Sequence, residues 1–312
     1  MISLSEFYKS VFGCKVYKVA IDAGCTCPNR DGSKGVGGCI FCSESGSGEF
    51  ASSRRMSISE QIEEGKMRIM SKLRGRSGGR NGKFIAYFQN FTSTYGNADE
   101  LCAKYSEALS CDDVVGIAIA TRPDSLGEKI LDFLAEISQS RFVQIELGLQ
   151  TSNENTGALI NRCYTDADYE NAVRMIKSRS PKIHIVTHLI FGLPNETESD
   201  MMNSVDFVLK NKTDGIKITV LYVLENTRLA QMYFNSDFSV LSKDEYFSLV
   251  SKAAAKFPDD LVVHRLTGDP PKSLLIEPQW TCDKKKVMNE MRKIIFEKKI
   301  KKKFLKLLTR LL

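Results

Sequence analysis

Short apolar runs alternate with helical stretches along the first two thirds of the chain. A continuous apolar run bounded by polar residues is typical of a strand buried in a parallel sheet. Six such runs predict strands at residues 16–21, 84–89, 114–120, 142–149, 183–190 and 215–221. The stretches between them predict helices at residues 57–73, 98–109, 126–137, 166–177 and 198–209, with a further short helix before residue 15. Because each parallel connection needs a crossover, the alternation predicts an α/β fold with helices outside a parallel sheet.

The composition is ordinary for a globular protein, but the charge is unevenly distributed. The 312 residues are 42% hydrophobic and 26% charged, which suits one large α/β domain or two smaller ones. No apolar run approaches the roughly 18 residues of a membrane span, so none is expected. The net charge is +6, yet residues 284–312 carry 12 Lys and Arg against two acids, which makes this tail +10 and the remainder −4. Residues 72–83 form a second basic stretch, expected to be a flexible loop.

Three cysteines, Cys27, Cys39 and Cys42, lie in one glycine-rich stretch with the spacing C-x11-C-x2-C. Glycine accepts positive φ at little cost, so the loop can fold back and bring Cys27 to the other two. Four Cys would suggest structural zinc or an electron-transfer cluster, whereas three Cys on a [4Fe-4S] cluster leave one iron open. Structural zinc is the main alternative, and Cys25 competes with Cys27 as the first ligand.

A disulfide framework is the less favoured alternative for these cysteines. The chain contains nine Cys, an odd number, and its N-terminus lacks the apolar core of a secretory signal. This usage suits a reducing compartment, so we expect a cytoplasmic protein.

The segment that begins at Asp22, Asp-Ala-Gly-Cys-Thr-Cys-Pro-Asn-Arg-Asp-Gly, closely resembles a bacterial family of radical S-adenosylmethionine (SAM) proteins. This family is related to the radical SAM domain of Elongator protein 3, and the present chain is too short to hold the acetyltransferase domain. The resemblance implies that Cys27, Cys39 and Cys42 hold a [4Fe-4S] cluster, on which SAM is cleaved to a 5′-deoxyadenosyl radical. The superfamily spacing C-x3-C-x2-C is widened here, while Phe41, the aromatic residue before the last Cys, fits the superfamily pattern.

The resemblance also refines the expected fold. Radical SAM enzymes share a partial barrel, so the strand–helix units imply an α/β fold with a partial (β/α)6 TIM-like barrel and a C-terminal helical extension. We expect the barrel core at residues 1–224, and at 225–312 an extension packed on the barrel with a basic amphipathic tail. The active site is then expected at the carboxyl ends of the strands.

Polar residues follow the predicted strands where such a site would lie. After the second strand the superfamily motif Gly-Gly-Glu is absent, and Thr92 or Gln89 is expected to replace it as a SAM contact. Gln150 and Arg162 match a pair that related enzymes place against the SAM ribose and carboxylate, although a single Arg more often forms a surface salt bridge. An Arg-Pro-Asp ending at Asp124 resembles Elongator-type proteins, or only caps the next helix.

The stretch that begins at His188, His-Leu-Ile-Phe-Gly-Leu-Pro-Asn-Glu-Thr, resembles a block of Elongator-type and coproporphyrinogen-dehydrogenase-type radical SAM proteins. The resemblance places His188 against SAM or substrate, although a lone His in a strand is more often a hydrogen-bonded core residue. Gly192 is expected to let the backbone approach the cofactor. Lys217 alternates with apolar neighbours and would need an anion inside a barrel, so it joins His188 as a candidate catalytic residue. Arg265 and Asp269 belong to a further family block, and either reach the site or stabilise a loop.

Elongator protein 3 modifies the wobble uridine of tRNA, so the resemblance implies a tRNA-modifying enzyme. An electron donor such as flavodoxin or ferredoxin is expected. The basic stretches at residues 72–83 and 284–312 are compatible with tRNA binding, although an amphipathic helix on the barrel, a membrane surface or a protein partner would look similar. Two alternatives are a radical SAM enzyme acting on a small molecule or peptide, and a non-catalytic, metal-bearing module that binds RNA or a partner.

Overall fold

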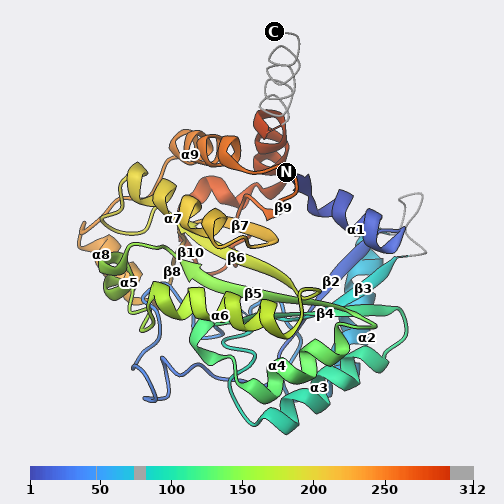
Figure 1. The fold of residues 1–312 in the computed structure, drawn as a ribbon. Coiled ribbons are helices and arrows are strands. Elements are labelled where there is room, and N and C mark those ends of the chain that lie inside the picture. Colours follow the sequence, from blue (N-terminus) through green and yellow to red (C-terminus); the bar gives the residue numbers. More distant parts are fainter. Residues whose placement is uncertain (47, 74–81, 296–312) are drawn as a thin grey trace.

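The computed structural model describes residues 1–46, 48–73 and 82–295. Its centre is an eight-stranded sheet of order β1-β9-β7-β6-β5-β4-β3-β2 that curves into an open barrel (Figure 1). The strands of this sheet are β1 (Ile2–Ser3), β2 (Val16–Ile21), β3 (Lys83–Phe88), β4 (Val114–Thr121), β5 (Phe142–Gln150), β6 (His184–Phe191), β7 (Gly215–Val220) and β9 (Val262–Arg265). Every neighbouring pair is parallel, so the carboxyl ends of all the strands meet at one edge.

The predicted partial barrel is confirmed, and its sheet is wider than expected. The six predicted strands correspond to β2 through β7. Two more strands extend the β7 edge: β9 pairs with β7, and β1 pairs with β9 through Ile2 and Val262. Strand β9 has only four residues, two of them His264 and Arg265, so it lacks the continuous apolar run that identified the others. The predicted division of the chain at residue 224 stays a prediction.

Helices connect successive strands and begin at polar caps. The predicted crossovers are α2 (Ile58–Leu73), α3 (Ala98–Ser110), α4 (Glu128–Ile137), α6 (Asp166–Arg179) and α7 (Glu198–Lys210). Thr165 and Thr197 each start a helix with a capping box, which satisfies backbone N–H groups of the first turn. A further helix, α5 (Glu154–Leu159), was not predicted because six residues are too few to show a helical period.

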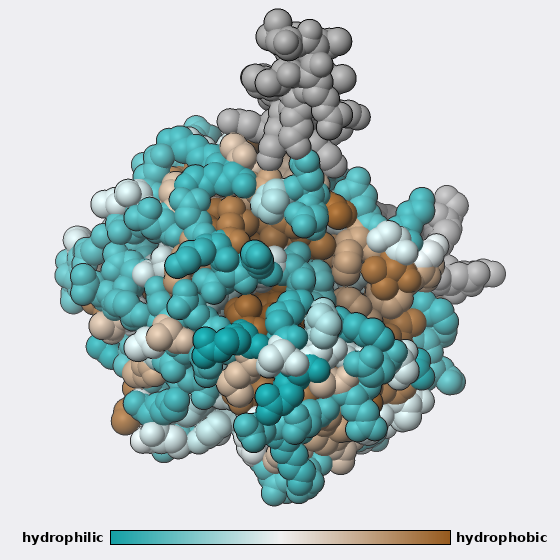
Figure 2. Space-filling model, in the orientation of Figure 1, coloured by the Kyte–Doolittle hydropathy of each residue, from teal (hydrophilic) through white to brown (hydrophobic). Residues whose placement is uncertain are grey.

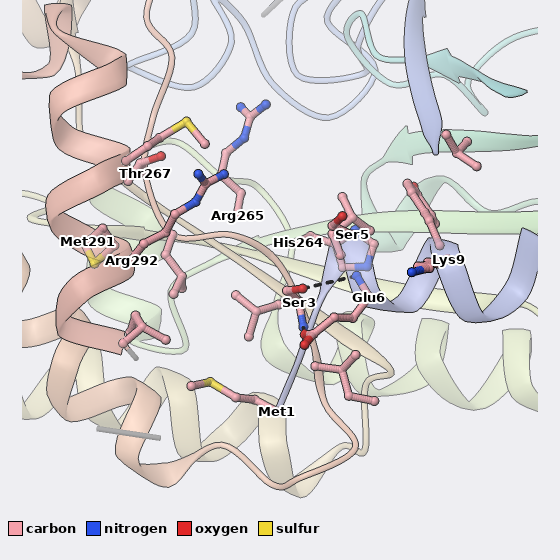
Figure 3. A pocket seen from close by; sticks show the side chains of 18 of the residues that line it. Met1, Ser3, Ser5, Glu6, Lys9, His264, Arg265, Thr267, Met291 and Arg292 are labelled. Carbon is pink, nitrogen blue, oxygen red and sulfur yellow. Dashed lines mark hydrogen bonds between the residues drawn. The ribbon is translucent and has the colours of Figure 1, made fainter. Parts of the chain in front are cut away.

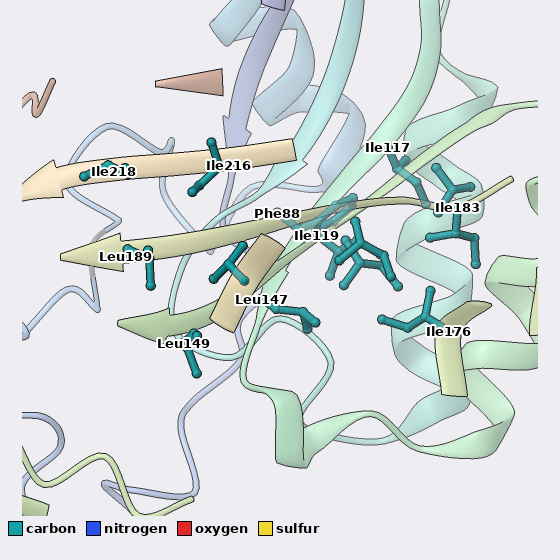
Figure 4. Close-up of a cluster of buried hydrophobic side chains, with 14 of the residues drawn as sticks. Phe88, Ile117, Ile119, Leu147, Leu149, Ile176, Ile183, Leu189, Ile216 and Ile218 are labelled. Atoms are coloured by element: carbon teal, nitrogen blue, oxygen red, sulfur yellow. The ribbon is translucent and has the colours of Figure 1, made fainter. Parts of the chain in front are cut away.

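The main core lies between the outer face of the sheet and these helices. Alternate strand residues point to this face, because successive side chains of a strand lie on opposite sides. Figure 4 shows such side chains gathered from neighbouring strands, among them Ile117, Ile119, Leu147, Leu189 and Ile216. Each of these five is fully buried, so the outer layer fixes the curvature of the barrel.

The amino end of the barrel is closed by α1 (Leu4–Phe12). The Tyr8 side chain is buried against Ile85, Tyr87 and Ala118 in a separate hydrophobic cluster. The Phe7 ring stacks on His184, the first residue of β6, with ring centres 4.7 Å apart. The barrel interior is therefore closed at its amino end, opposite the edge where the predicted site lies.

The C-terminal part of the chain packs on the barrel. It contains α8 (Arg228–Phe234), α9 (Lys243–Lys256), a pair of short strands, β8 (Val223–Leu224) and β10 (Leu275–Glu277), and helical residues 284–295. Val287 and Met291 bury their side chains in the main core. The helical residues 284–295 lie beside the N-terminus in Figure 1. The predicted basic loop and tail fall partly outside the described residues, at 74–81 and 296–312. Among the residues described, no helix combines the length and apolar character needed to cross a membrane.

Candidate metal and cofactor site

The three cysteines of the glycine-rich loop lie near one another beyond the carboxyl end of β2. The Cys42 N–H donates to the Cys39 carbonyl at 3.0 Å, so these two residues share one turn. Burial, together with the nearby Cys42 and Cys27, raises the pKa of the Cys39 thiol to about 12. Neighbouring thiolates repel one another, so each thiol is harder to ionise beside the others. A bound metal cation would stabilise all three thiolates. Within the described ranges, no three Cys, His, Asp or Glu side chains are arranged as ligands of a metal ion.

The connection between α5 and α6 holds the cysteine loop in place. The Asn161 side-chain amide donates to the carbonyls of Gly38 at 2.8 Å and Val36 at 3.2 Å. In return, the Asn29 amide donates to the Asn161 carbonyl and lies 3.7 Å from the Cys39 sulfur. Asn161 has a φ of 57°, in the left-handed region that Asn tolerates better than most residues. Both its backbone and its side chain therefore bind the segment that carries Cys39.

Arg30 fixes the last turn of the same loop. Its guanidinium donates to the Cys42 and Glu44 carbonyls, each at 3.2 Å, and to the Ser43 carbonyl. A Cβ on Gly38 would come within 2.9 Å of Arg30 Nε, so glycine at this position leaves room for the guanidinium. The short motif Cys-Pro-Asn-Arg thus supplies one candidate ligand and two side chains that hold the loop.

The predicted Arg-Pro-Asp turn ties the cysteine loop to the sheet. Asp124 accepts hydrogen bonds from Arg122 at 2.9 and 2.8 Å and from Lys34 Nζ at 2.7 Å. Burial opposes ionisation of Asp124, but the hydrogen bonds and charges of Arg122 and Lys34 hold its pKa below the usual value. Lys34 lies within the cysteine loop, so Asp124 joins that loop to the carboxyl end of β4.

Arg162 is completely buried next to this turn. Its five N–H groups donate to five protein oxygens: the carbonyls of Leu149, Thr151 and Tyr164 and the carboxylates of Glu154 and Asp166. These bonds join the end of β5 to α5 and α6. The predicted contact between Arg162 and SAM stays a prediction, because all its donors bind protein atoms in this conformation.

Two other predicted SAM contacts have polar atoms without partners. Among the described residues, Thr92 Oγ1 and Gln150 Oε1 are buried and take part in no hydrogen bond. Gln150 ends β5 with a φ of 70°, where the register with β6 shifts, and such a bulge redirects a side chain. Buried polar atoms in native proteins almost always have a hydrogen-bond partner. Each of these two oxygens is therefore suited to accept a hydrogen bond from a bound ligand. Thr92 follows β3 and Gln150 ends β5, so both stand at the edge where the cysteine loop lies.

Comparison with known families identifies the chain. The model of the Radical SAM superfamily matches residues 27–208, more than half of the chain. The chain belongs to the radical SAM superfamily. The model of the Radical_SAM C-terminal domain matches residues 213–297. Members of the superfamily conventionally bind a [4Fe-4S] cluster and SAM. The three thiols, together with the unpartnered oxygens of Thr92 and Gln150, fit these groups.

Individual radical SAM relatives extend the likeness. The "Uncharacterized protein YtqA" of Bacillus subtilis (strain 168) is 40% identical over 291 residues, which cover 93% of this chain and 88% of that protein. A "tRNA uridine(34) acetyltransferase" of Methanocaldococcus jannaschii is 26% identical over 166 residues, covering 52% of this chain and 30% of the relative. The solved structure of Methanocaldococcus infernus Elp3 matches with a TM-score of 0.64 at 17% identity, covering 90% of this chain and 63% of that chain. At this identity the structural match supports the fold alone.

The interior of the radical SAM barrel contains a charged layer, which the sequence analysis found only in part. Glu146 on β5 accepts hydrogen bonds from Tyr87 at 2.6 Å, Gln144 at 2.7 Å, Lys18 at 2.6 Å and Lys217 at 3.3 Å. Lys217 therefore lies inside the barrel and has its expected anion. Lys18 and Glu146 were missed, although each alternates with apolar neighbours in the same way as Lys217.

The charges of this layer depend on one another. Burial disfavours the charge on Glu146, but Lys18 and Lys217 hold its pKa well below the usual value. Burial, together with the charges of Arg265 and Lys18, lowers the pKa of Lys217 to about 8. The nearby Glu146 carboxylate opposes this shift. The charge of Lys217 therefore changes at a pH close to neutral.

Gly192 directly follows β6 and Phe41 lies in the cysteine loop, whereas His188 lies within β6, opposite Lys217. His188 Nε2 lies 3.0 Å from Thr219 Oγ1, and burial and the charge of Lys217 keep the pKa of this His well below its usual value. A Cβ on Gly192, whose φ is 88°, would lie 2.9 Å from a Leu241 methyl carbon, so backbone conformation and packing both require glycine. Phe41 packs against a small cluster of apolar residues. Contacts of these three residues with a cofactor stay predictions.

Cys25 differs from its neighbour Cys27. The Cys25 side chain is buried in the main hydrophobic core, and burial raises the pKa of its thiol to about 11. Cys27 is only partly buried. This placement favours Cys27 as the candidate ligand.

Proposed function

We propose that this radical SAM enzyme modifies tRNA, at the side chain of the wobble uridine. The likeness to the tRNA uridine(34) acetyltransferase covers about half of this chain, and the fold matches Elp3 along nine tenths of it. The observation that carries the proposal is the cysteine loop, held by Arg30 and Asn161 beside the unpartnered oxygens of Thr92 and Gln150. The net charge of +6 favours a polyanionic substrate.

The residues of the site have separate roles in this proposal. Cys27, Cys39 and Cys42 hold the cluster, and Thr92 and Gln150 bind polar groups of SAM. When bound, the cluster and SAM supply a 5′-deoxyadenosyl radical that removes a hydrogen atom from the substrate. The protein's own contribution is to position the reactants and to exclude water.

The neighbouring residues keep this arrangement rigid. Asn161 and Arg30 fix the backbone on both sides of Cys39, and Asp124 anchors the same loop to β4 through Lys34. Burial keeps the pKa of His188 well below its usual value, so a neutral imidazole lies beside Thr219 and can form hydrogen bonds without adding charge. At the opposite end of the barrel, α1 packs Tyr8 against Ile85, Tyr87 and Ala118.

An anaerobic turnover assay tests the proposal. The full chain is reconstituted with iron and sulfide, reduced with dithionite and mixed with SAM, and 5′-deoxyadenosine is measured with and without bulk tRNA. The variant Cys39→Ala removes a candidate ligand, and Cys282→Ala is the matched control on an unrelated turn. We expect product formation that rises with tRNA, is lost in Cys39→Ala and persists in Cys282→Ala.

The other outcomes are equally informative. Product formation that is indifferent to tRNA would refute the tRNA assignment and leave a radical SAM enzyme with a small-molecule or peptide substrate. Absence of SAM cleavage by the cluster-loaded protein would refute catalysis and favour a binding role for the cysteine loop. Nucleoside analysis of the recovered tRNA would then locate the modified base.

A further inference from the structure

A large pocket opens on the side of the barrel, away from the cysteine loop. Its volume is about 1320 Å³, and its walls come from the start of the chain, the beginning of β2, β9 and its following loop, and helical residues 284–295. Figure 2 shows hydrophobic side chains exposed on this face of the molecule, surrounded by hydrophilic ones. A volume of this order accommodates a small organic molecule.

The pocket carries an excess of positive charge. Its basic side chains are Lys9, Lys15, Arg265, Lys284, Arg292 and Lys293, and its acidic ones are Glu6 and Asp269. Both acids are already engaged, since Glu6 binds the Ser3 backbone N–H at 2.9 Å and Asp269 pairs with Lys284. Among the residues described, the guanidinium groups of Arg265 and Arg292 form neither a hydrogen bond nor an ion pair. Figure 3 shows both guanidinium groups extending into the same part of the pocket.

Arg265 also connects the pocket to the charged layer inside the barrel. It lies opposite Lys217 in the register of β9 and β7, so both side chains project from adjacent strands at the same level. Burial raises the pKa of Tyr87 well above its usual value and lowers that of Lys217; the positive charge of Arg265 opposes the first shift and adds to the second, and so reaches the groups that surround Glu146. Glu146 already accepts four hydrogen bonds. Its single negative charge therefore faces three nearby cations, Lys18, Lys217 and Arg265.

Two polar atoms beside Arg265 lack partners. The Tyr222 hydroxyl is buried and, among the described residues, has no hydrogen bond; a Cβ on Gly268, which lines the pocket, would overlap it. His264 contributes an unpartnered Nδ1, while its Nε2 lies 2.9 Å from His184 Nε2. An unpaired guanidinium and a free hydroxyl beside it are donors that suit an oxyanion, and His264 Nδ1 is a third donor in the tautomer that has its proton on that nitrogen.

We propose that Arg265, with Tyr222 and Lys217 beside it, binds the acidic group of a small second substrate that enters through the side pocket. The acidic group is a carboxylate or a phosphate, since a guanidinium binds either through two parallel hydrogen bonds. Arg292 attracts the same anion at the pocket wall. The inference does not depend on tRNA being the other substrate.

The position of this subsite suits a reactant that extends toward the carboxyl edge of the barrel. Lys217 precedes Thr219, the partner of His188, by two residues, or about 7 Å along a strand. On β5, which neighbours the strand of His188, Glu146 precedes Gln150 by four residues, or about 13 Å. An acid bound at Arg265 therefore leaves the remainder of a small molecule within reach of the cofactor edge.

Binding calorimetry of the full, cluster-loaded chain tests this subsite without SAM or tRNA. The probes are succinate for the carboxylate class and glycerol phosphate for the phosphate class, at fixed pH and ionic strength. We expect saturable binding of one molecule per chain for at least one probe. Arg265→Gln should weaken it by about 10- to 100-fold, the value of a charge-assisted hydrogen bond. Arg174→Gln, which removes an exposed Arg on α6, should leave it unchanged.

Two further variants separate binding from folding. Tyr222→Phe removes only the unpartnered hydroxyl, so it should weaken the probe several-fold without lowering the melting temperature. Arg265→Lys keeps the charge but loses the planar fork, and should restore part of the affinity lost in Arg265→Gln. Binding of only one probe would assign the chemical class of the acid.

Three results would overturn the proposal: no saturable binding of either probe, unchanged binding in Arg265→Gln, or binding of a short RNA but of neither small anion. Because no SAM cleavage is measured, failure of this subsite is distinguishable from failure of the tRNA proposal.

Discussion

Replacing Glu146 by Gln would remove the carboxylate that lies between two lysines inside the barrel. Lys18 and Lys217 donate to it at 2.6 and 3.3 Å, and Glu146 itself is 4% exposed. The substitution keeps the size of the side chain but leaves both ammonium groups without their counter-charge. Removing one partner of a buried ion pair costs about 3–5 kcal/mol, because an uncompensated charge remains in a medium of low polarity.

The expected loss for Glu146→Gln is therefore about 3–5 kcal/mol in the free energy of unfolding. Lys217→Met in the same chain removes one of the two stranded charges, so the double variant should lose less than the sum of the single variants. Glu128→Gln is the matched control, because the Glu128 side chain is 79% exposed and pairs with Arg179 at 3.4 Å. Such a surface pair contributes no more than about 1 kcal/mol.

Urea unfolding followed by circular dichroism measures these differences. The midpoints and slopes are compared at one pH for the wild type, the two single variants, the double variant and the control. A loss below about 1 kcal/mol for Glu146→Gln, or strict additivity in the double variant, would show that water or rearrangement already screens the charges and would refute the reasoning.

Three other predictions concern pH, backbone strain and the cysteine loop. Burial raises the pKa of Glu196 from 4.5 to about 7, so its stability contribution is complete below pH 4.5 and is lost as the pH rises through 7. From pH 5 to 8 the wild type should lose about 2–3 kcal/mol more than Glu196→Gln in urea unfolding, and parallel pH profiles would contradict this. Gly192→Ala should cost about 1–3 kcal/mol by the same assay, because its φ is 88° and the new methyl group meets Leu241. The double variant with Leu241→Ala should recover only the packing part, and full recovery would exclude backbone strain. Asn161→Ala removes the amide donors to Val36 and Gly38, so iron per chain after reconstitution should fall at least twofold, while Asn155→Ala should load like the wild type.

The strands that the sequence predicts well are those with one continuous apolar run. β4 and β6 are buried on both faces, so their composition alone distinguishes them from loops and amphipathic helices. β9 escapes this test because two of its four residues are His264 and Arg265. Its place in the sheet depends on pairing with β7, and a local pattern contains no information about such a partner.

The site residues that could be predicted are those that stand in a short sequence motif or directly after a predicted strand. Cys39 and Cys42 stand in one short motif, and Gln150 follows a strand directly. The role of Asn161 depends instead on contacts with Gly38 across more than a hundred residues, which only the folded chain reveals. The charged layer was missed for a similar reason, because Glu146 resembles an exposed strand residue until the barrel closes around it.

The pairing of β1 with β9 has a consequence for synthesis on the ribosome. Ile2 forms its backbone contacts with Val262, so the first strand to emerge must wait for nearly the whole chain. At about 5–20 residues per second, this wait lasts roughly 13–50 s. From the synthesis of β7 until that of β9, β7 presents an unpaired edge, and unpaired edges favour aggregation. Conditions that slow translation of the last third of the chain should therefore lower the yield of native protein more than conditions that slow the beginning.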